Sequence, residues 1–160
     1  MQYRSIESPV GPLLLAGDEA GLRFVLFSKG GRPAVPQPDW APDGGLLAEP
    51  VRQLTEYFKG KLRTFDVPVA PVGTAFQRAV WWQLQAIPYG ETVSYGELAR
   101  RLGNPRAVRA VGLANGSNPI SIIIPCHRVI GSNGSLVGYG GGLPTKQALL
   151  ALERGQGTLL

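Results

Sequence analysis

Hydrophobic residues near the start of the chain gather in three short runs that are rich in strand-forming side chains. The runs cover residues 2–7, 13–16 and 22–27, and the turn-forming residues 8–11 and 17–21 separate them. Short apolar runs bounded by glycine, proline and serine are typical of strands joined by tight turns. The pattern therefore predicts a small antiparallel sheet.

A second pattern follows this predicted sheet. Residues 28–45 hold four prolines and four glycines with little apolar periodicity, which predicts a partly mobile loop with no assignable chemistry. From Leu46 to Phe58, apolar residues recur at helical spacing, and Gly60 follows. We expect one amphipathic helix here that covers a face of the sheet.

Residues 68–73 are rich in proline and small residues and are interpreted as a linker. Thr74 and Gln77 have the spacing of a capping box, so a helix is expected from there to Pro88. Its inward face would carry Phe76, Val80, Leu84 and Ile87, and core packing is the favoured reason for the Trp81-Trp82 pair.

Two shorter helices are predicted next. Ser94 and Glu97 form a second capping-box pattern that leads a helix to Leu102. After Gly103, Asn104 would cap a third helix running from Pro105 to about Asn115. Two short helices joined by a glycine turn are a helix-turn-helix candidate. The predicted fold class is therefore α/β (α+β), with a sheet-and-helix domain over residues 1–70 and a mostly helical domain over 71–160.

The third predicted helix carries a stripe of small residues, Ala107, Ala110 and Ala114, with Arg106 and Arg109 beyond it. Small side chains allow a helix to approach another surface closely. Two interpretations stay open: close packing against a neighbouring helix with solvated arginines, or a helix that enters a nucleic-acid groove with arginines available to phosphates or to the base stack.

Composition supports a globular protein with a basic second half. The 160 residues are 44% hydrophobic, enough to build a packed core. Residues 1–75 hold eight Lys/Arg and eight Asp/Glu, whereas residues 76–160 hold eight Lys/Arg against three Glu, so the net charge of +5 belongs to the second half. This asymmetry suggests a polyanion partner, although ordinary solvated surfaces also reach such a charge.

Other features of the composition exclude several classes of protein. No apolar run is long enough to span a membrane and the first residues lack a signal-peptide core, so a soluble, cytoplasmic protein is expected. One cysteine excludes an internal disulfide, and one histidine beside it makes a structural metal site unexpected.

That cysteine, Cys126, follows a β-branched run that is predicted to be a buried strand ended by Pro125. A free thiol has a pKa of about 8.5 and needs a nearby base or cation to react at neutral pH. His127 and Arg128 would supply these, His127 through a turn or a bridging water because neighbours on an extended segment point to opposite faces. A buried, inert cysteine is the alternative.

The residues around Cys126 carry a family resemblance. The run Pro125-Cys126-His127-Arg128-Val129-Ile130, with Asn118-Pro119 before it and residues 138–143 after it, resembles the active-site region of the O6-alkylguanine-DNA alkyltransferases. The resemblance covers residues 74–155 closely and the first domain more loosely, chiefly in residues 8–11 and the strand pattern.

The resemblance implies a reaction and a division of labour. An alkyl group on O6 of a damaged guanine in double-stranded DNA would move directly and once to Cys126, with no cofactor. His127 would act as a base through water, Glu153 would orient His127, and Asn118 would brace the turn. A guanine inside a duplex must be flipped out before it can react. Tyr95 would meet the flipped base and Arg109 would fill the vacated place in the stack.

The resemblance also assigns the surroundings of the nucleophile. Tyr139 would line the pocket, backbone groups of Val129 and Gly140 would read the guanine edges, and Ser121 would influence the permitted alkyl size because some relatives have proline there. The expected DNA contacts are Tyr95, Asn104, Arg106, Ala107, Arg109, Ala110, Gly112 and Arg128.

One departure and two alternatives remain. Some family members bind zinc in the first domain through Cys and His ligands that are absent here, so no metal is expected. The main alternative is a non-catalytic lesion-binding protein of the same fold, although such relatives replace the cysteine. The other is a cysteine hydrolase, in which catalytic Cys and His are usually distant in the chain. We expect a monomer in solution and no membrane partner.

Overall fold

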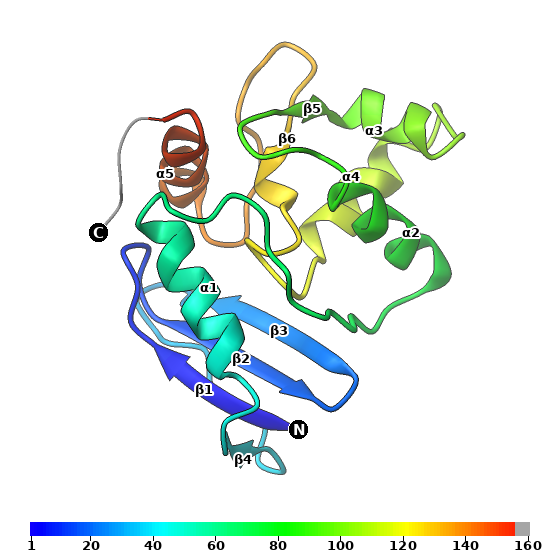
Figure 1. Cartoon of the computed structure of the whole chain (residues 1–160). Coiled ribbons are helices and arrows are strands. Elements are labelled where there is room, and N and C mark those ends of the chain that lie inside the picture. The colour runs from blue at the N-terminus through cyan, green and yellow to red at the C-terminus, as the bar shows by residue number, and fades with distance from the viewer. Residues whose placement is uncertain (156–160) are drawn as a thin grey trace.

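The computed structural model describes residues 1–155, which form a mixed α/β fold (Figure 1). Three strands, β1 (Gln2–Ile6), β2 (Leu13–Asp18) and β3 (Gly21–Phe27), pair in antiparallel fashion as predicted. A fourth strand, β4 (Ala41–Pro42), pairs with β1 in parallel and gives the order β3-β2-β1-β4. The predicted loop thus contributes an edge strand that its proline and glycine content concealed.

Helix α1 (Ala48–Phe58) lies across one face of this sheet (Figure 1). Its start is held by Asp43, whose carboxylate accepts hydrogen bonds from the backbone N–H groups of Gly45 and Leu47. Within α1, Leu54, Tyr57 and Phe58 are buried, as the helical spacing of apolar residues predicts.

The segment predicted as a linker is in fact fastened to the sheet. Leu22 donates its backbone N–H to the carbonyl of Pro68 and accepts from the N–H of Ala70. Val69 forms a β-bridge with Leu22. The domain division at residue 70 therefore stays a prediction, and residues 156–160 of the second predicted domain lie outside the described residues.

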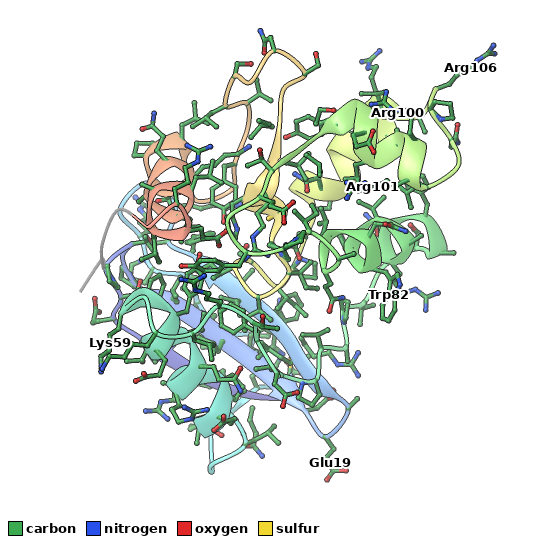
Figure 2. All side chains as sticks on the ribbon, turned by 45° about the horizontal axis from the view of Figure 1, so that its top comes forward. Glu19, Lys59, Trp82, Arg100, Arg101 and Arg106 are labelled. Atoms are coloured by element: carbon green, nitrogen blue, oxygen red, sulfur yellow. The ribbon has the colours of Figure 1, made fainter. Side chains whose placement is uncertain are left out.

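Helix α2 (Ala75–Leu84) has the predicted capping box, with the Thr74 side chain and the Gln77 side chain each bonded to the other's backbone N–H. The two tryptophans separate. Trp81 is buried and donates its indole N–H to the Ala114 carbonyl at 2.8 Å, whereas Trp82 is 73% exposed and points away from α2 (Figure 2). The expectation that both pack in the core was wrong for Trp82, because neighbouring helical residues face different directions.

The helical pair that follows differs in detail from the prediction. Helix α3 (Tyr95–Arg101) is capped by Ser94, which accepts from the Glu97 N–H at 3.0 Å, while the Glu97 carboxylate pairs with Arg100 and Arg101. Helix α4 (Val108–Gly116) begins later than expected, because a turn from Asn104 to Ala107 precedes it and no side chain caps it. Asn104 is therefore not the helix cap.

The β-branched run before Cys126 is not a strand. Ile120 forms one isolated bridge to Val25 and the following residues turn, with Ile122 in the left-handed region at φ 71°. A short 3₁₀ helix, η1 (Cys126–Arg128), leads into β6 (Val129–Ile130), which pairs in parallel with β5 (Val93–Ser94). The run was mistaken for a strand because its hydrophobicity reflects burial, which a turn can also require.

Helix α5 (Leu143–Glu153) ends the described chain and lies beside η1 (Figure 1). One buried apolar cluster joins the two halves of the chain and includes Leu13 and Val25 from the sheet, Leu54 from α1, and Leu149 from α5. Among residues 1–155, no helix has the length and hydropathy that crossing a bilayer requires.

Candidate active site

The position of Cys126 is set by the turn between α4 and η1. The Asn118 side chain donates to the Ile124 carbonyl at 2.7 Å and accepts from the Ile120 N–H at 3.0 Å, so one amide holds both arms of the turn. Asn115 adds a longer contact of 3.4 Å to the Cys126 carbonyl. A β-branched residue such as Ile122 is rarely found at positive φ, and such conformations gather at functional sites.

Cys126 opens onto a small pocket of about 180 Å³ between α4 and the segment before α5. The thiol residue itself is only 5% exposed. Six residues that the resemblance singles out, from distant parts of the chain, line this pocket together with the cysteine: Tyr95, Gly112, Asn118, Ser121, Tyr139 and Gly140. Val129 lies outside this wall, buried in β6, and its carbonyl accepts from Lys146 at 2.8 Å.

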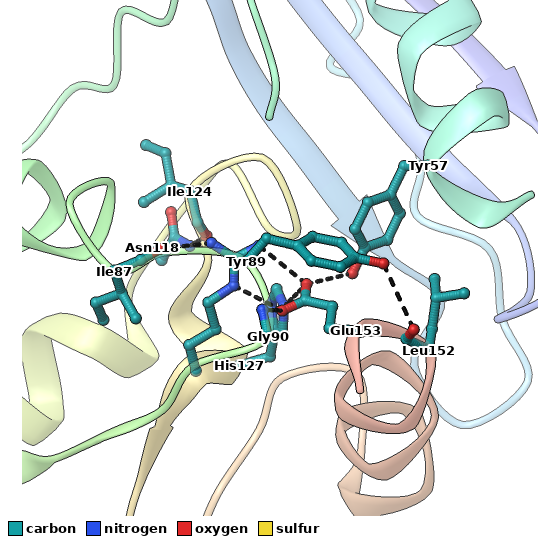
Figure 3. Close-up of polar contacts among 10 residues, drawn as sticks. Tyr57, Ile87, Tyr89, Gly90, Asn118, Ile124, His127, Leu152 and Glu153 are labelled. Carbon is teal, nitrogen blue, oxygen red and sulfur yellow. Dashed lines mark hydrogen bonds and ion pairs between the residues drawn. The ribbon is translucent and has the colours of Figure 1, made fainter. Parts of the chain in front are cut away.

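Glu153 organises a buried polar cluster that includes Tyr57 and His127 (Figure 3). Its Oε2 lies 2.7 Å from Nε2 of His127, and Arg128 donates to both of its oxygens, at 2.7 Å from Nε and 3.0 Å from Nη2. Tyr57 Oη donates to Oε2 at 2.6 Å. Arg128 also donates to the Ile87 carbonyl, so its guanidinium is well satisfied.

The charges of this cluster define the state of His127. Burial opposes ionisation of Glu153, but the hydrogen bonds and positive charges of His127 and Arg128 outweigh it and hold the pKa of that carboxyl well below its usual range. Burial lowers the pKa of His127, which is therefore neutral near pH 7, although Glu153 partly opposes the shift. Nε2 then carries the proton donated to Glu153.

The other ring nitrogen is consequently a base. Within residues 1–155, Nδ1 of His127 is buried and has no hydrogen-bond partner. An unsatisfied buried nitrogen in a polar cluster is a feature of sites that bind water or transfer protons. Cys126 and His127 both belong to the 3₁₀ helix η1, so they are not neighbours on an extended segment.

Burial raises the pKa of the Cys126 thiol, while the Asn118 amide and the positive charge of Lys146 oppose that shift. Lys146 is fully buried on α5, and its Nζ donates to the carbonyls of Val129 and Val137. The resting cysteine is therefore a protonated thiol. The Lys146 cation and the basic Nδ1 of the neighbouring His127 favour its conversion to the thiolate during the reaction.

Two tyrosines border the thiol. Tyr139 is half-buried with its hydroxyl fully buried, and this burial raises the pKa of its phenol well above the usual value. Its hydroxyl has no hydrogen-bond partner within the described part of the chain. Burial also raises the pKa of Tyr95, whose hydroxyl donates to the Val137 carbonyl at 3.3 Å. Both phenols are protonated at neutral pH. The Tyr139 hydroxyl can donate to a ligand, and the Tyr95 hydroxyl can do so by giving up its bond to Val137.

The predicted DNA-contacting residues divide into two groups. Asn104, Arg106, Arg109 and Ala110 are exposed, and Figure 2 shows Arg106 directed away from the body of the molecule. Ala107 and Gly112 are half-buried, and Ala114 of the same stripe is buried. The two ends of the stripe therefore differ. Its Ala114 end packs against the neighbouring helix α2, and its Ala110 end faces solvent and is accessible to a partner.

Arg128 does not belong to this surface. Its side chain is buried, and its donors are directed at Glu153 and at the Ile87 carbonyl. The expectation that Arg128 contacts DNA was wrong, because the site needs its charge to balance a buried carboxylate.

Sequence reasoning missed three functional positions: Tyr57, Asn115 and Lys146. Tyr57 lies in α1, far along the chain from Glu153, and no local pattern links the two. Lys146 is a cation on the inward face of an otherwise apolar helix, and this pattern could have identified it as a site residue. In the part of the chain that the structure describes, no group of three or more His, Cys, Asp or Glu could hold a metal ion.

The fold and the site define a class of protein: one that presents a buried cysteine, backed by a His-Glu-Arg cluster, below an exposed basic helical surface. Comparison with known sequences and structures agrees. Residues 1–71 match the family model of the 6-O-methylguanine DNA methyltransferase ribonuclease-like domain, and residues 75–155 match that of the DNA binding domain.

Individual relatives extend this match to the whole chain. A methylated-DNA–protein-cysteine methyltransferase of Methanosarcina acetivorans is 56% identical over 153 residues, which cover 96% of this chain and 98% of the relative. The Mycobacterium tuberculosis protein of that name is 52% identical over 155 residues, covering 96% and 93%. The crystal structure of Mycobacterium tuberculosis OGT in complex with DNA has a TM-score of 0.89 at 51% identity, covering 99% of this chain and 96% of that one.

The chain therefore belongs to the O6-methylguanine DNA methyltransferase family. The family resemblance read from residues 125–130 and the mixed α/β fold class are both confirmed.

Proposed function

We propose that this protein repairs DNA by transferring an alkyl group from O6 of guanine in duplex DNA to its own Cys126, once per molecule. The observation that carries the proposal is the placement of the chain's single cysteine at the base of a pocket and next to a neutral His127 bound to Glu153. Membership of a family whose relatives are named methylated-DNA–protein-cysteine methyltransferases supports the same activity.

The reaction balances within this site. The Sγ of Cys126 forms a bond to the alkyl carbon, the bond from that carbon to O6 breaks, and its electron pair stays with the guanine. The thiol proton passes to Nδ1 of His127 through water, the guanine anion takes up a proton from solvent, and His127 then returns its extra proton to solvent. Glu153 keeps Nε2 protonated and stabilises the charge that His127 acquires.

Each neighbour of the thiol has a role in this scheme. Lys146 favours the thiolate through its positive charge, and Asn118 keeps the turn that presents it. The protonated hydroxyls of Tyr139 and Tyr95 are available to the flipped guanine, and the open backbone at Gly140 allows the base to approach closely because a Cβ there would meet nothing within 4 Å.

Binding to DNA is assigned to α4 and to the turn before it. The small, exposed Ala110 permits close approach to a minor groove, and Arg109 is free to fill the space left by the flipped base. The minor groove carries little sequence information, so the lesion rather than the sequence would be selected. We further propose that the protein acts as a monomer in the cytoplasm, with residues 1–70 and 71–160 as its two domains.

The proposal is tested with duplex DNA that carries O6-[³H-methyl]guanine. Label should move to the protein and map to the Cys126 peptide, and Cys126→Ser should bind the duplex but accept no label. A lesion-binding protein of the same fold would leave the label on DNA. A cysteine hydrolase would turn over small esters without DNA. Transfer by Cys126→Ser within tenfold of the parent protein would overturn the assignment.

A further inference from the structure

A second and larger cavity, of about 490 Å³, adjoins the Cys126 pocket. The two share Gly116, Asn118, Ser121 and Gly140 as lining residues. Neither Gly116 nor Gly140 has an atom within 4 Å of where a Cβ would stand, so at these two shared residues no side chain separates the cavities. A group attached to a guanine in the first pocket can therefore extend into the second.

The walls of the larger cavity come from the sheet and the segment after it. Leu26 and Phe27 at the end of β3 line this cavity with Pro33, Ala34 and Val35, so its wall is largely apolar. Val35 is 81% exposed and adds an accessible apolar side chain to this wall. This surface suits a flat or aliphatic group that is larger than methyl.

Two cationic residues, Lys29 and Arg32, line this cavity. Lys29 and Arg32 pair their backbone N–H and carbonyl groups, at 2.9 and 3.0 Å, around a tight Gly30-Gly31 turn. Both side chains are exposed and, within residues 1–155, neither makes a hydrogen bond or ion pair with another side chain. The residues that line the cavity include no carboxylate, so Lys29 and Arg32 are the charged side chains on its lining.

We propose that this cavity is a subsite for the O6 substituent and that Lys29 and Arg32 make the protein select bulky substituents that end in an anionic group. A carboxybenzyl group represents the class: its ring would lie on the wall formed by Phe27 and Val35, and its carboxylate would meet the two cations. The inference rests on the proposed function, since the substituent is held there while its benzylic carbon is transferred to Cys126.

The transfer itself is unchanged. Sγ forms the bond to the benzylic carbon and the carbon–O6 bond breaks, with the electron pair leaving on the guanine. The carboxylate takes no part in bond making, and it changes the rate through attraction to the Lys29-Arg32 turn alone. This attraction acts between exposed charges and must therefore weaken as salt is added.

The test compares two duplexes of the same sequence, one with O6-(4-carboxybenzyl)guanine and one with the neutral O6-(4-methylbenzyl)guanine. Single-turnover transfer to the intact protein is measured for both by mass spectrometry. The parent protein should prefer the carboxylate about tenfold at low salt, with the preference lost at high salt. A Lys29→Ala/Arg32→Ala variant should react equally with both, and Lys29→Glu/Arg32→Glu should prefer the neutral substrate.

A charge-matched control removes two exposed cations elsewhere, Arg4→Ala/Lys61→Ala, and should keep the preference of the parent protein. Comparison of the two substrates in one variant cancels any general effect on DNA affinity. Equal rates in the parent protein, or a preference that survives in Lys29→Ala/Arg32→Ala, would overturn the inference while methyl and benzyl transfer to Cys126 upheld the proposed function. Absence of transfer from every duplex would overturn both.

Discussion

Glu153 of α5 joins two distant parts of the chain: the neighbouring residues His127 and Arg128 of η1, and Tyr57 of α1. A buried carboxylate bound to a cation and two further donors is strongly favoured as an ion, which explains why its pKa lies below the usual range despite burial. The residue therefore serves chemistry and stability together.

Replacing Glu153 by Gln should separate these two contributions. Arg128 would remain buried without a counter-charge, so the free energy of unfolding should fall by about 3 kcal/mol. Transfer should slow at least about tenfold because His127 loses the charge that stabilises its protonated form. Chemical denaturation and single-turnover kinetics measure the two effects. Unchanged kinetics would remove Glu153 from the mechanism.

Tyr57→Phe removes one donor to Glu153 and leaves the ring in the core. A hydrogen bond to a charged group contributes about 1.5 to 3 kcal/mol, so the free energy of unfolding should fall by about that amount, with a smaller decrease in transfer rate than Glu153→Gln causes. Tyr89→Phe is the matched control, since its hydroxyl contacts the Leu152 carbonyl at 3.5 Å instead. Equal losses in the two variants would show that the Tyr57 bond has no special weight.

At the residue scale, a contiguous motif predicted which residues lie near one another, while their catalytic roles stay predictions. Cys126, His127 and Asn118 lie in one recognisable stretch; the structure places Cys126 and Asn118 on one pocket and bonds His127 to Glu153. Tyr57 and the true partner of Arg128 could not be predicted, because both depend on how α1 and α5 meet in space.

At the scale of elements, the local signals worked when side chains acted on their own backbone. The Thr74-Gln77 capping box and the spacing of apolar residues in α1 predicted these helices well. The run before Cys126 and the start of α4 were misread, since an Asn118 side chain and a turn at Asn104 replace the expected ladder and cap. Tertiary contacts, not propensity, decide these segments.

Helix α4 carries the clearest prediction for DNA recognition. Arg109→Ala should slow transfer from a duplex lesion about tenfold or more, yet change reaction with free O6-benzylguanine less than twofold, because only a duplex needs the stack held open. Arg4→Ala, on β1, is the control for lost charge. Equal losses on the two substrates would mean that Arg109 shapes the pocket instead.

For the whole molecule, the buried His127 and Glu153 predict how stability depends on pH. Both have a lower pKa in the folded state than in the unfolded state, where the reference values are 6.5 and 4.5. As the pH falls below 6.5, the unfolded chain binds protons that the folded chain refuses, so the free energy of unfolding decreases with acidification.

The slope should approach about 1.4 kcal/mol per pH unit for each group that titrates. Denaturation at pH 7, 6 and 5 measures it, and His127→Gln should flatten the decline over this range. A protein whose stability is constant from pH 7 to 5 would contradict the neutral, buried state of His127.

The reaction should also change the whole molecule. An alkyl group on Cys126 occupies a site where the thiol is already buried and held by the Asn118 turn. Overpacking of this kind usually costs about 1 to 3 kcal/mol, so the alkylated protein should melt at a lower temperature than the free protein. Equal melting temperatures would reject the strain while leaving the transfer intact.

The measurement that tests the central claim most directly is a titration of the protein with excess O6-methylguanine duplex, followed by the intact mass of the protein and of its Cys126 peptide. Because Cys126 is the chain's one cysteine and the thioether it forms is a poor alkyl donor, each molecule should gain a single methyl group on that peptide and then stop. Repeated turnover, or a methyl group carried on any other residue, would contradict the account.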